Sequence, residues 1–353
     1  MKILMVAPYF YPEGGGLERY AYEMAKELSE KNNVAVICAT KLESKEEKIG
    51  GIKILRKKPN FILSNTPIRF FLPFELLRMV KIQNFDVIIT HTPVPFFADV
   101  ASLVSKLLKM PLIIVYHTGD LKKGSWVDFL AKLYERTVEK ITMRNAEVIS
   151  VSRYVQRILW EKGFYSKVKY PKIDEDFILA KPNFKGEGNT ILFVGQLGKF
   201  HRWKNLELVL RAVVFVKKEL PDVKLVVVGS GDMVEYYKRL ARDLNLEENV
   251  EFLGYVSKEE LIRTYKSAKI LVLPSSKSEA FGLVALEALA LGTPVVVSKV
   301  GEFPVIVEDG KGGFLTKLNE RDLAEKILFL LRNEKIRRKM AIIGRKTIKH
   351  FIS

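Results

Sequence analysis

Two glutamates in the second half of the chain have the type and spacing to bind a charged ligand. Glu279 lies in a loop after a short apolar run, and Glu287 lies in the helical pattern that begins after Gly282. Unpaired N–H groups at a helix start attract anions, so those of Gly282, Leu283 and Val284 could bind a diphosphate. Helical side chains lean toward the N-terminus, so Glu287 could reach a ribose beside those phosphates. The alternative is a loop cap and a solvated helix residue.

A glycine-rich loop, Pro12-Glu13-Gly14-Gly15-Gly16, precedes a helical pattern near Leu17 in the first half. Consecutive glycines let backbone N–H groups approach a ligand closely, so Gly15 and Gly16 could contact a phosphate or a sugar hydroxyl. A plain tight turn is the alternative. The spacing is not Gly-x-Gly-x-x-Gly, and no acidic residue ends the next strand at Thr40-Lys41. A nicotinamide oxidoreductase is therefore disfavoured.

The apolar runs that must position these residues alternate with helical patterns twice along the chain. In the first half they predict strands at Ile3–Ala7, Val34–Ala39, Ile52–Leu55, Val87–Thr90, Leu112–Tyr116 and Val148–Val151. In the second half they predict strands at Ile191–Val194, Leu225–Val228, Val250–Leu253, Ile270–Leu273 and Val295–Ser298, and helices near 206–219, 234–244, 259–267 and 283–291. Such alternation predicts parallel sheets covered on both faces, with ligands at the carboxyl ends of the strands. The polar stretch 171–188 predicts two domains with a cleft between them.

Composition narrows the class of protein. With 353 residues and 48% hydrophobic content, the chain can bury a core large enough for two domains. Its one cysteine, Cys38, favours a reducing, cytoplasmic location and excludes a multi-cysteine metal site. No apolar stretch is long enough to span a bilayer, and the N-terminal run reads as a buried strand and not a signal peptide.

The net charge of +17 is compatible with nucleic acid, an anionic membrane or an anionic substrate. Both halves share the excess, unlike a basic arm, so nucleic acid is disfavoured. Residues 51–81 are locally basic, with Lys53, Arg56, Lys57, Lys58, Arg69, Arg78 and Lys81 against the single Glu75. Apolar residues are interleaved with them: Phe61, Ile62, Phe70, Phe71, Phe74 and Leu77. This pattern predicts a peripheral contact with an anionic membrane, at its inner face; a loop and helix packed on their own domain are the alternative.

The glutamate segment, from Ser278-Glu279-Ala280-Phe281-Gly282 to Glu287-Ala288-Leu289-Ala290, resembles the Glu-x7-Glu signature of retaining glycosyltransferase family 4 (glycosyl transferases group 1). Further similar blocks are Gly15–Arg19, Phe193-Val194-Gly195, Gly292–Val296 and Asp309-Gly310 with Gly313-Phe314-Leu315. The resemblance covers nearly the whole chain. It implies the α/β GT-B architecture, with two Rossmann-like parallel-sheet domains facing across a cleft. Residues 1–172 would bind the acceptor, residues 183–333 the nucleotide sugar, and 334–353 would form a helix that returns to the first domain.

The resemblance also implies roles for individual residues. Gly195 would end the donor-phosphate strand, Lys204 would neutralise the diphosphate, and the amides from Phe281 to Val284 would bind it. Glu279 would position the donor sugar and Glu287 the ribose. The family often places an arginine where this chain has Gln196; Lys199, His201 or Arg202 could replace it, and Arg202 is favoured.

His117 matches the family's histidine near the reacting sugar, where an imidazole could hydrogen-bond a sugar hydroxyl or stabilise charge in the transition state. A structural histidine is the alternative. His91 and His350 are interpreted as structural. Asp174-Glu175-Asp176 resembles the tail of another family segment and not a metal-binding Asp-x-Asp, so we expect no metal site.

The resulting hypothesis is a retaining, metal-independent transferase. It would move a hexose from a UDP- or GDP-linked donor to a lipid-linked or glycan acceptor, with no cofactor besides the donor as co-substrate. A nucleotide-sugar epimerase on the same fold, or a non-catalytic binder of nucleotide sugars or nucleic acid, stays open as the alternative.

Overall fold

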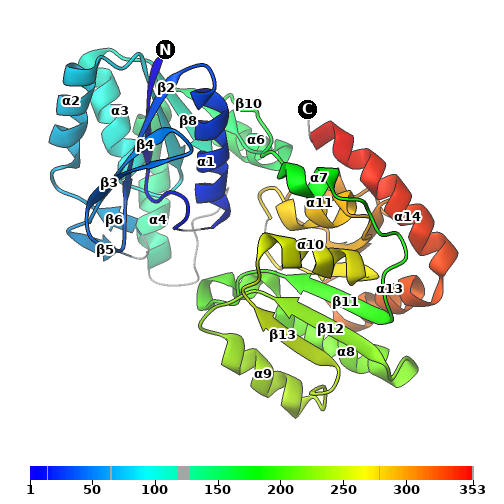
Figure 1. Ribbon diagram of the computed structural model, residues 1–353. Helices are drawn as coiled ribbons and strands as arrows, with labels where there is room; N and C mark the ends of the chain where they lie inside the picture. Colours follow the sequence, from blue (N-terminus) through cyan, green and yellow to red (C-terminus); the bar gives the residue numbers. More distant parts are fainter. Residues whose placement is uncertain (14, 64–65, 118–126, 278, 352–353) are drawn as a thin grey trace. The chain divides into compact units, whose positions relative to one another are not determined.

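The computed structural model describes residues 1–13, 15–63, 66–117, 127–277 and 279–351. It divides into two compact units, Met1–Tyr170 and Pro171–Ser353, each with its own parallel sheet (Figure 1). Gly14 of the glycine loop, Ser278 of the glutamate segment and residues 118–126 after His117 lie outside the described residues. The division falls at the start of the polar stretch, and residues 171–182 belong with the second unit.

The first unit is built on an eight-stranded sheet in the order β10-β9-β8-β7-β1-β2-β4-β3. Its strands are β1 (Lys2–Ala7), β2 (Asn33–Ala39), β3 (Lys45–Ile49), β4 (Ile52–Lys57), β7 (Val87–Thr92), β8 (Leu112–Tyr116), β9 (Glu147–Ser150) and β10 (Lys167–Val168), with a separate hairpin of β5 (Phe61–Leu63) and β6 (Thr66–Ile68). All neighbours in the sheet are parallel except β3, which runs antiparallel to β4 at the edge. The central strands β1, β2 and β7 are buried along almost their whole length, because helices cover both of their faces.

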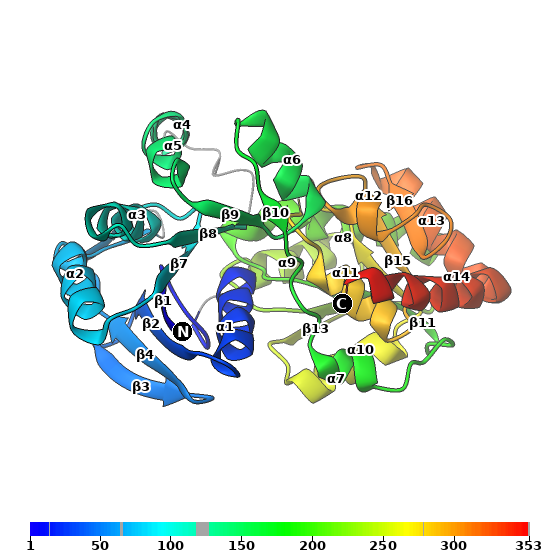
Figure 2. The ribbon, with the colours of Figure 1, turned by 90° about the horizontal axis from the view of Figure 1, so that it is seen from above.

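The helices of this unit are α1 (Gly16–Ser29), α2 (Leu72–Gln83), α3 (Phe97–Leu108), α4 (Val127–Arg136), α5 (Val138–Met143) and α6 (Arg153–Glu161). Figure 2 shows α1 on one face of the sheet and α2 and α3 on the other. Because α1 is the next element after β1, its start lies near the carboxyl end of that strand, where parallel sheets bind ligands.

The second unit is built on a six-stranded, fully parallel sheet in the order β13-β12-β11-β14-β15-β16. Its strands are β11 (Asn189–Val194), β12 (Val223–Val228), β13 (Val250–Gly254), β14 (Ile270–Leu273), β15 (Val295–Ser298) and β16 (Gly313–Thr316). The order reverses next to β11, so the loops after β11 and β14 leave the sheet side by side.

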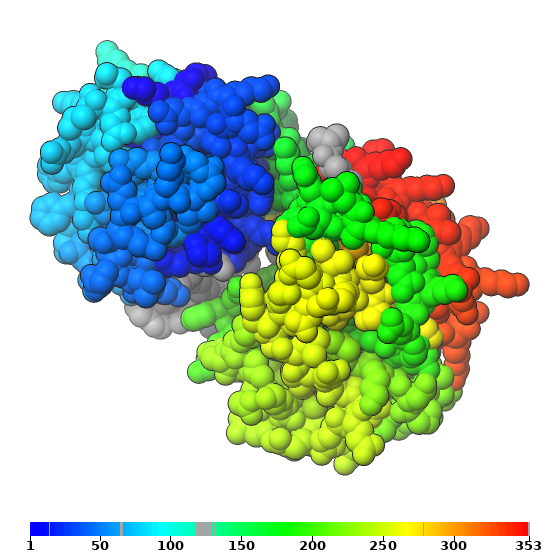
Figure 3. All heavy atoms as spheres, viewed as in Figure 1, coloured from blue at the N-terminus to red at the C-terminus, as the bar shows by residue number. Residues whose placement is uncertain are grey.

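The α-helices of the second unit are α7 (Glu175–Leu179), α8 (Leu206–Glu219), α9 (Val234–Asp243), α10 (Lys258–Ser267), α11 (Leu283–Ala290), α12 (Phe303–Ile306), α13 (Glu320–Arg332) and α14 (Glu334–Thr347). Two short 3₁₀ helices, η1 (Lys199–Lys204) and η2 (Ile348–Phe351), complete the unit. Helices α8 and α13 contact one face of the sheet, and α10 and α11 contact the other. Atoms of α10 form the yellow patch on the visible face of this unit in Figure 3.

Helix α14 packs on α11, α13 and β16 within the second unit. Arg345 of α14 donates a hydrogen bond of 2.6 Å to the carbonyl of Ala290, at the carboxyl end of α11. The predicted return of the terminal segment to the first domain stays a prediction. None of the described helices combines the length and the apolar character that crossing a bilayer would require.

Candidate active site

Gly195 directly follows β11 and leaves room for the side chain of Lys204. A Cβ atom on Gly195 would come within 2.7 Å of Lys204 Cδ. The amide of Gly195 donates a 3.0 Å hydrogen bond to the carbonyl of Val228, and a Cβ atom on Gly229 would lie 1.9 Å from the carbonyl oxygen of Gly195. Two glycines thus let the ends of β11 and β12 approach closely, and the lysine lies over the first of them.

The ammonium of Lys204 meets the carboxylate of Glu279, so two predicted site residues from different loops lie together. Their Nζ and Oε2 atoms are 3.5 Å apart, and the side chains are only 13% and 16% exposed. Lys204 Nζ also lies 4.8 Å from the ring centroid of Trp203, and the Ser275 hydroxyl lies 3.4 Å from Glu279 Oε2. Within the second unit, this pair presents a cation and an anion at the carboxyl ends of β11 and β14.

The loop that carries Glu279 is held on both sides by hydrogen bonds. The amide of Ser276 donates to the carbonyl of Trp203 at 2.6 Å, and the amide of Glu302 donates to the carbonyl of Glu279 at 2.9 Å. Gly301 has a φ of +59°, and a Cβ atom there would lie 2.0 Å from the carbonyl oxygen of Glu279. No motif marks Gly301 and Glu302 for this role, although their place just after the predicted strand Val295–Ser298 was a signal.

Helix α11 begins at Gly282, whose φ of +81° and ψ of +41° favour glycine. A Cβ atom there would come within 2.7 Å of the Phe303 ring. The first turn has no acidic side chain, and no described residue accepts a hydrogen bond from the amides of Leu283 and Val284. These two N–H groups are available to an anion. Phe281 has a different environment: its side chain is buried, with its ring 6.3 Å from that of Phe351.

Glu287 lies in the middle of α11 and is buried, with 5% of its surface exposed. The hydroxyl of Tyr265 donates a 3.0 Å hydrogen bond to its Oε2 atom. Tyr265 is itself fully buried and packs against the ring of Phe177 at 6.0 Å between centroids. The carboxylate is therefore held in one orientation, by a tyrosine that the sequence analysis did not single out.

The three candidates for the cation missing at Gln196 have different surroundings. Arg202 lies 3.6 Å from Glu207 Oε2 and 5.8 Å from the Tyr236 ring, with 57% of its side chain exposed. Lys199 is exposed. Burial and then the Lys204 ammonium lower the pKa of His201 below its usual value. Of the three, His201 is the side chain whose protonation is disfavoured by Lys204.

In the first unit, the carboxylate of Glu18 already accepts a hydrogen bond at the start of α1. The amide of Gly15 donates a 2.6 Å hydrogen bond to Glu18 Oε2, and the amide of Arg19 donates to the carbonyl of Gly15 at 3.1 Å. An anionic ligand at Gly15 would have to displace Glu18. Gly16 leaves space for a ligand, since no described atom other than those of its chain neighbours and of its own helix backbone lies within 4 Å of where its Cβ would be. A neutral sugar hydroxyl fits these surroundings better than a phosphate does.

Arg56 fixes the loop that leads to Gly15, which corrects its assignment to a basic surface. Only 1% of Arg56 is exposed, and it donates hydrogen bonds to the carbonyls of Phe10, at 2.9 Å, and Tyr11. Its guanidinium also pairs with Glu47, and with Glu13 at 3.6 Å. Arg56 is buried because it shares a face of β4 with Ile52 and Ile54. The alternation of side chains along a strand could have predicted this position.

His117 follows β8, and its ring contacts that of His91 at the end of β7. His91 Nδ1 and His117 Nε2 are 2.9 Å apart, and both side chains are buried. Burial lowers the pKa of His91 to about 3, and burial together with His91 lowers the pKa of His117. Both rings are therefore neutral at physiological pH.

The acidic segment between the two predicted domains pairs with a lysine of α10. Lys258 Nζ lies 2.8 Å from Asp174 Oδ2 and 2.7 Å from Asp176 Oδ2. The Asp174 side chain also accepts a hydrogen bond from the amide of Asp176 at the start of α7. Across the described part of the chain, no three His, Cys, Asp or Glu side chains are grouped as metal ligands would be.

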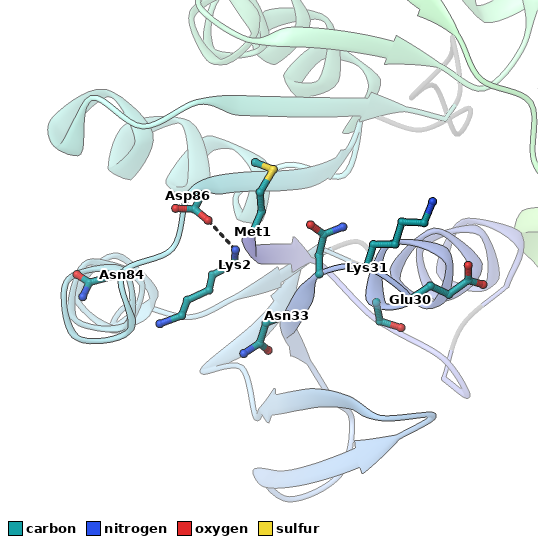
Figure 4. Close-up of a pocket in the computed structure, with 9 residues that line it drawn as sticks. Met1, Lys2, Glu30, Lys31, Asn33, Asn84 and Asp86 are labelled. Atoms are coloured by element: carbon teal, nitrogen blue, oxygen red, sulfur yellow. Dashed lines mark hydrogen bonds between the residues drawn. The ribbon is translucent and has the colours of Figure 1, made fainter.

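A hollow of about 790 Å³ lies at the amino ends of β1 and β2, lined by Met1, Lys2, Ser29, Glu30, Lys31, Asn32, Asn33, Asn84 and Asp86. Figure 4 shows the hydrogen bond across it, from the Lys2 amide to the Asp86 carboxylate at 2.7 Å. This edge of the sheet is opposite to the carboxyl ends that carry Gly16 and His117. The hollow is therefore not the candidate active site.

Comparison with known proteins agrees with this geometry. The glycosyl transferases group 1 family model matches residues 174–347, and the glycosyltransferase family 4 model matches residues 14–174. An uncharacterized glycosyltransferase of Methanocaldococcus jannaschii is 29% identical over 335 residues, which is 89% of this chain and 84% of that protein. The phosphatidyl-myo-inositol mannosyltransferase of Mycobacterium tuberculosis is 23% identical over 366 residues, which is 99% of this chain and 93% of that protein.

Solved structures show the same fold. HepE of Anabaena in complex with UDP-glucose superposes with a TM-score of 0.76 at 21% identity, over 99% of this chain and 95% of that one. WaaG, a glycosyltransferase involved in lipopolysaccharide biosynthesis, superposes with a TM-score of 0.72 at 18% identity, over 98% and 94% of the chains. With both halves matched by family models, the chain belongs to the glycosyltransferases of family 4 and group 1, which have two parallel-sheet domains in the GT-B fold.

Proposed function

We propose that this glycosyltransferase is a retaining, metal-independent hexosyltransferase that uses a UDP- or GDP-linked sugar. The observation that carries the proposal is the Lys204–Glu279 pair, 3.5 Å apart, next to an α11 start with two available amides. The two charged phosphates of a nucleoside diphosphate would be bound by the Lys204 ammonium and by these two amides. The UDP and UDP-glucose complexes of HepE support a uridine nucleotide among the donors to be tested.

In the proposed reaction, the bond between the anomeric carbon and the diphosphate oxygen breaks. The negative charge that develops on the diphosphate is stabilised by Lys204 and by the amides of Leu283 and Val284. The acceptor hydroxyl attacks on the face that the diphosphate leaves, and its proton passes to a phosphate oxygen. Glu279 positions the sugar, and Glu287, held by Tyr265, binds the ribose hydroxyls. No cofactor takes part besides the donor itself.

We place a glycan or lipid-linked acceptor on the first unit, where His117 would face the reacting sugar. His117 follows β8, and Gly16 lies at the carboxyl end of β1. In the sheet these two strands are separated only by β7, so both residues lie at the same edge. By its name, the mycobacterial relative glycosylates a phospholipid. A membrane-borne acceptor would require this unit to approach a bilayer.

The first unit has an apolar surface suited to that approach, at the β5–β6 hairpin and the start of α2. Six large apolar side chains there are 45–69% exposed: Phe61, Ile62, Leu63, Phe70, Phe71 and Phe74. Along α2, the exposed Arg78 and Lys81 continue the face of Phe71 and Phe74. We propose that this apolar surface docks on an anionic membrane at the inner, cytoplasmic face. Lys58 and Arg69 contribute less to it, since they pair with Glu43 and Glu75.

A thermal-shift panel of UDP-, GDP- and ADP-hexoses tests the proposal. One nucleotide class should raise the melting temperature of the wild type, because a ligand that binds only the folded state stabilises it. Lys204→Gln should lose most of that gain, whereas Lys238→Gln, at a surface lysine of α9 that pairs with Glu235, should keep it. Equal gains in all three proteins would remove Lys204 from the donor site.

The structure of the product then identifies the type of reaction. NMR coupling at the anomeric carbon should show the configuration of the donor, as a retaining transfer requires. Conversion of the donor to an epimer without acceptor would replace the proposal by an epimerase. Salt-sensitive binding to DNA with no stabilisation by any donor would replace it by a nucleic-acid binder.

A further inference from the structure

The two histidines of the first unit lie on neighbouring strands in a fixed register. His91 belongs to β7 and pairs with Val115 of β8, while the amide of His117 donates a 3.0 Å hydrogen bond to the carbonyl of Thr92. This register brings His91 Nδ1 within 2.9 Å of His117 Nε2. The contact therefore follows from the backbone of the sheet and not from two mobile side chains.

Because both rings are neutral, a single N–H group lies between them, and there are two ways to place it. In the first, His91 Nδ1–H donates to His117 Nε2, and His91 Nε2 is left as an unprotonated acceptor. In the second, His117 Nε2–H donates, and the proton of His91 must sit on its Nε2 atom. His91 Nε2 is fully buried, and no described residue is its hydrogen-bond partner.

The burial of His91 Nε2 without a partner distinguishes the two arrangements. An N–H group buried without an acceptor is rarer in proteins than an acceptor buried without a donor. The first arrangement leaves only an unpaired acceptor, so it is the favoured one. It also sets the tautomer of the partner: with Nε2 accepting, the proton of neutral His117 must be on Nδ1.

We infer that His91 is a positioning residue, whose Nδ1–H donates to His117 Nε2 and so presents the Nδ1–H of His117 as a donor to the reacting sugar. This inference rests on the proposed function for its ligand. Among the described residues, none accepts a hydrogen bond from His117 Nδ1, so none of them competes with a ligand for this N–H group.

A third ring prevents His117 from turning. The Tyr20 ring of α1 meets it edge-on, with centroids 5.0 Å apart and an interplanar angle of 86°. Tyr20 is itself anchored, since its hydroxyl donates to the carbonyl of Lys169 at 3.2 Å. A ring flip would place Cδ2 where Nδ1 lies and Cε1 where Nε2 lies, and this packing together with the contact to His91 holds the two nitrogens in place.

Nitrogen NMR of the full chain reads the tautomer directly. The chain has four histidines, so histidine-selective ¹⁵N labelling gives a simple spectrum, which His201→Asn and His350→Asn help to assign. In long-range ¹H–¹⁵N spectra at neutral pH, we expect Nδ1 of both His91 and His117 to be protonated, and His117 Nε2 to be bare. A wild-type spectrum with the proton on His117 Nε2 would overturn the inference.

Two substitutions separate positioning from packing. The amide nitrogen of His91→Asn can take the place of Nδ1, so this variant should keep the His117 tautomer. His91→Leu fills similar space without a donor and should lose that tautomer. The turnover number of His91→Leu should fall about ten- to a hundredfold with little change in the KM for the donor, while His91→Asn stays near wild type.

Equal losses in both variants, with the His117 tautomer unchanged, would show that His91 serves packing alone. The spectra are recorded on the free protein, and so they do not depend on the transfer activity. A wild-type protein that transfers no sugar would overturn the proposed function, whereas the wrong tautomer would overturn the role of His91 alone.

Discussion

At the level of single residues, Lys204 and Glu279 neutralise one another. Each is mostly buried, and a buried charge without a partner is costly, so the pairing offsets the cost of burying the two side chains. A diphosphate that binds Lys204 would take over the role of the carboxylate, which would then be available to the hydroxyls of the sugar. The sequence predicted both residues in the site. It did not predict their contact, which depends on how the loops after β11 and β14 leave adjacent strands.

We predict that Gly195→Ala weakens donor binding about tenfold, the loss expected for a displaced charge-assisted contact. The new Cβ would lie 2.7 Å from Lys204 Cδ and would push the lysine aside. Gly198→Ala is the matched control in the same loop, because its Cβ would meet its nearest neighbours at an ordinary 3.4 Å. Calorimetric titration with the preferred donor measures both, and an unchanged affinity in Gly195→Ala would contradict the placement of Lys204.

Gly16 gives a second test, because the fold itself does not require a glycine there. The position has no positive φ, and no described atom outside its chain neighbours and its own helix backbone lies within 4 Å of a Cβ. Gly16→Ala should therefore leave the free energy of unfolding unchanged or raise it by about 0.5–1 kcal/mol, since alanine is the better helix former.

If a substrate approaches the backbone at Gly16, the same variant should raise the KM or lower turnover about tenfold or more, because the methyl group occupies the substrate's space. Steady-state kinetics and urea unfolding on one preparation provide the two readings. Unaltered kinetics would show that the glycine loop does not contact the substrate.

At the level of helices and strands, hydrophobic patterning predicted the core. The predicted strand Leu112–Tyr116 matches β8, and the predicted helix 206–219 matches α8. The edge strand β3 was missed because it buries little: it reads Lys-Glu-Glu-Lys-Ile, and its residues are exposed or half-buried. A charged edge strand has no apolar period to detect, and charge is one way that proteins protect a sheet edge.

Arg56 shows what patterning overlooks when a charged residue is assumed to be exposed. It holds the loop between β1 and α1 through the carbonyls of Phe10 and Tyr11. Arg56→Met should lower the free energy of unfolding by about 3–5 kcal/mol, because it leaves buried carbonyls and carboxylates without their donor. The neighbouring Lys57→Met should cost less than about 1 kcal/mol, since Lys57 makes only a 3.9 Å ion pair with Glu75. Urea denaturation compares them, and equal losses would contradict the role of Arg56.

At the level of the whole molecule, each unit carries its candidate residues at the carboxyl ends of its own parallel sheet. The sequence located these residues because strand ends and glycines mark that edge. It could not identify the partners that orient them, Tyr265 for Glu287 and His91 for His117, since these contacts arise from packing between elements. Neither partner belongs to a sequence motif, so the sequence alone favours a structural interpretation of His91.

The apolar surface at β5, β6 and α2 predicts membrane binding by the complete protein. Sedimentation with vesicles that contain anionic lipid should carry down the wild type, and Phe71→Ser with Phe74→Ser should reduce the bound fraction several-fold as apolar contact area is lost. Trp160→Ser is the control, since Trp160 is 71% exposed on α6 and lies outside this surface. Equal binding by all three proteins would contradict a membrane contact at this surface.

The central claim is that the second unit holds the diphosphate of a sugar donor at the start of α11. A crystal structure of the protein with its preferred nucleotide sugar tests this most directly. We expect the diphosphate oxygens within hydrogen-bond distance of the Leu283 and Val284 amides and of Lys204 Nζ, with Glu279 turned toward the sugar. A donor bound elsewhere, with the Lys204–Glu279 pair intact and those two amides unoccupied, would contradict the account.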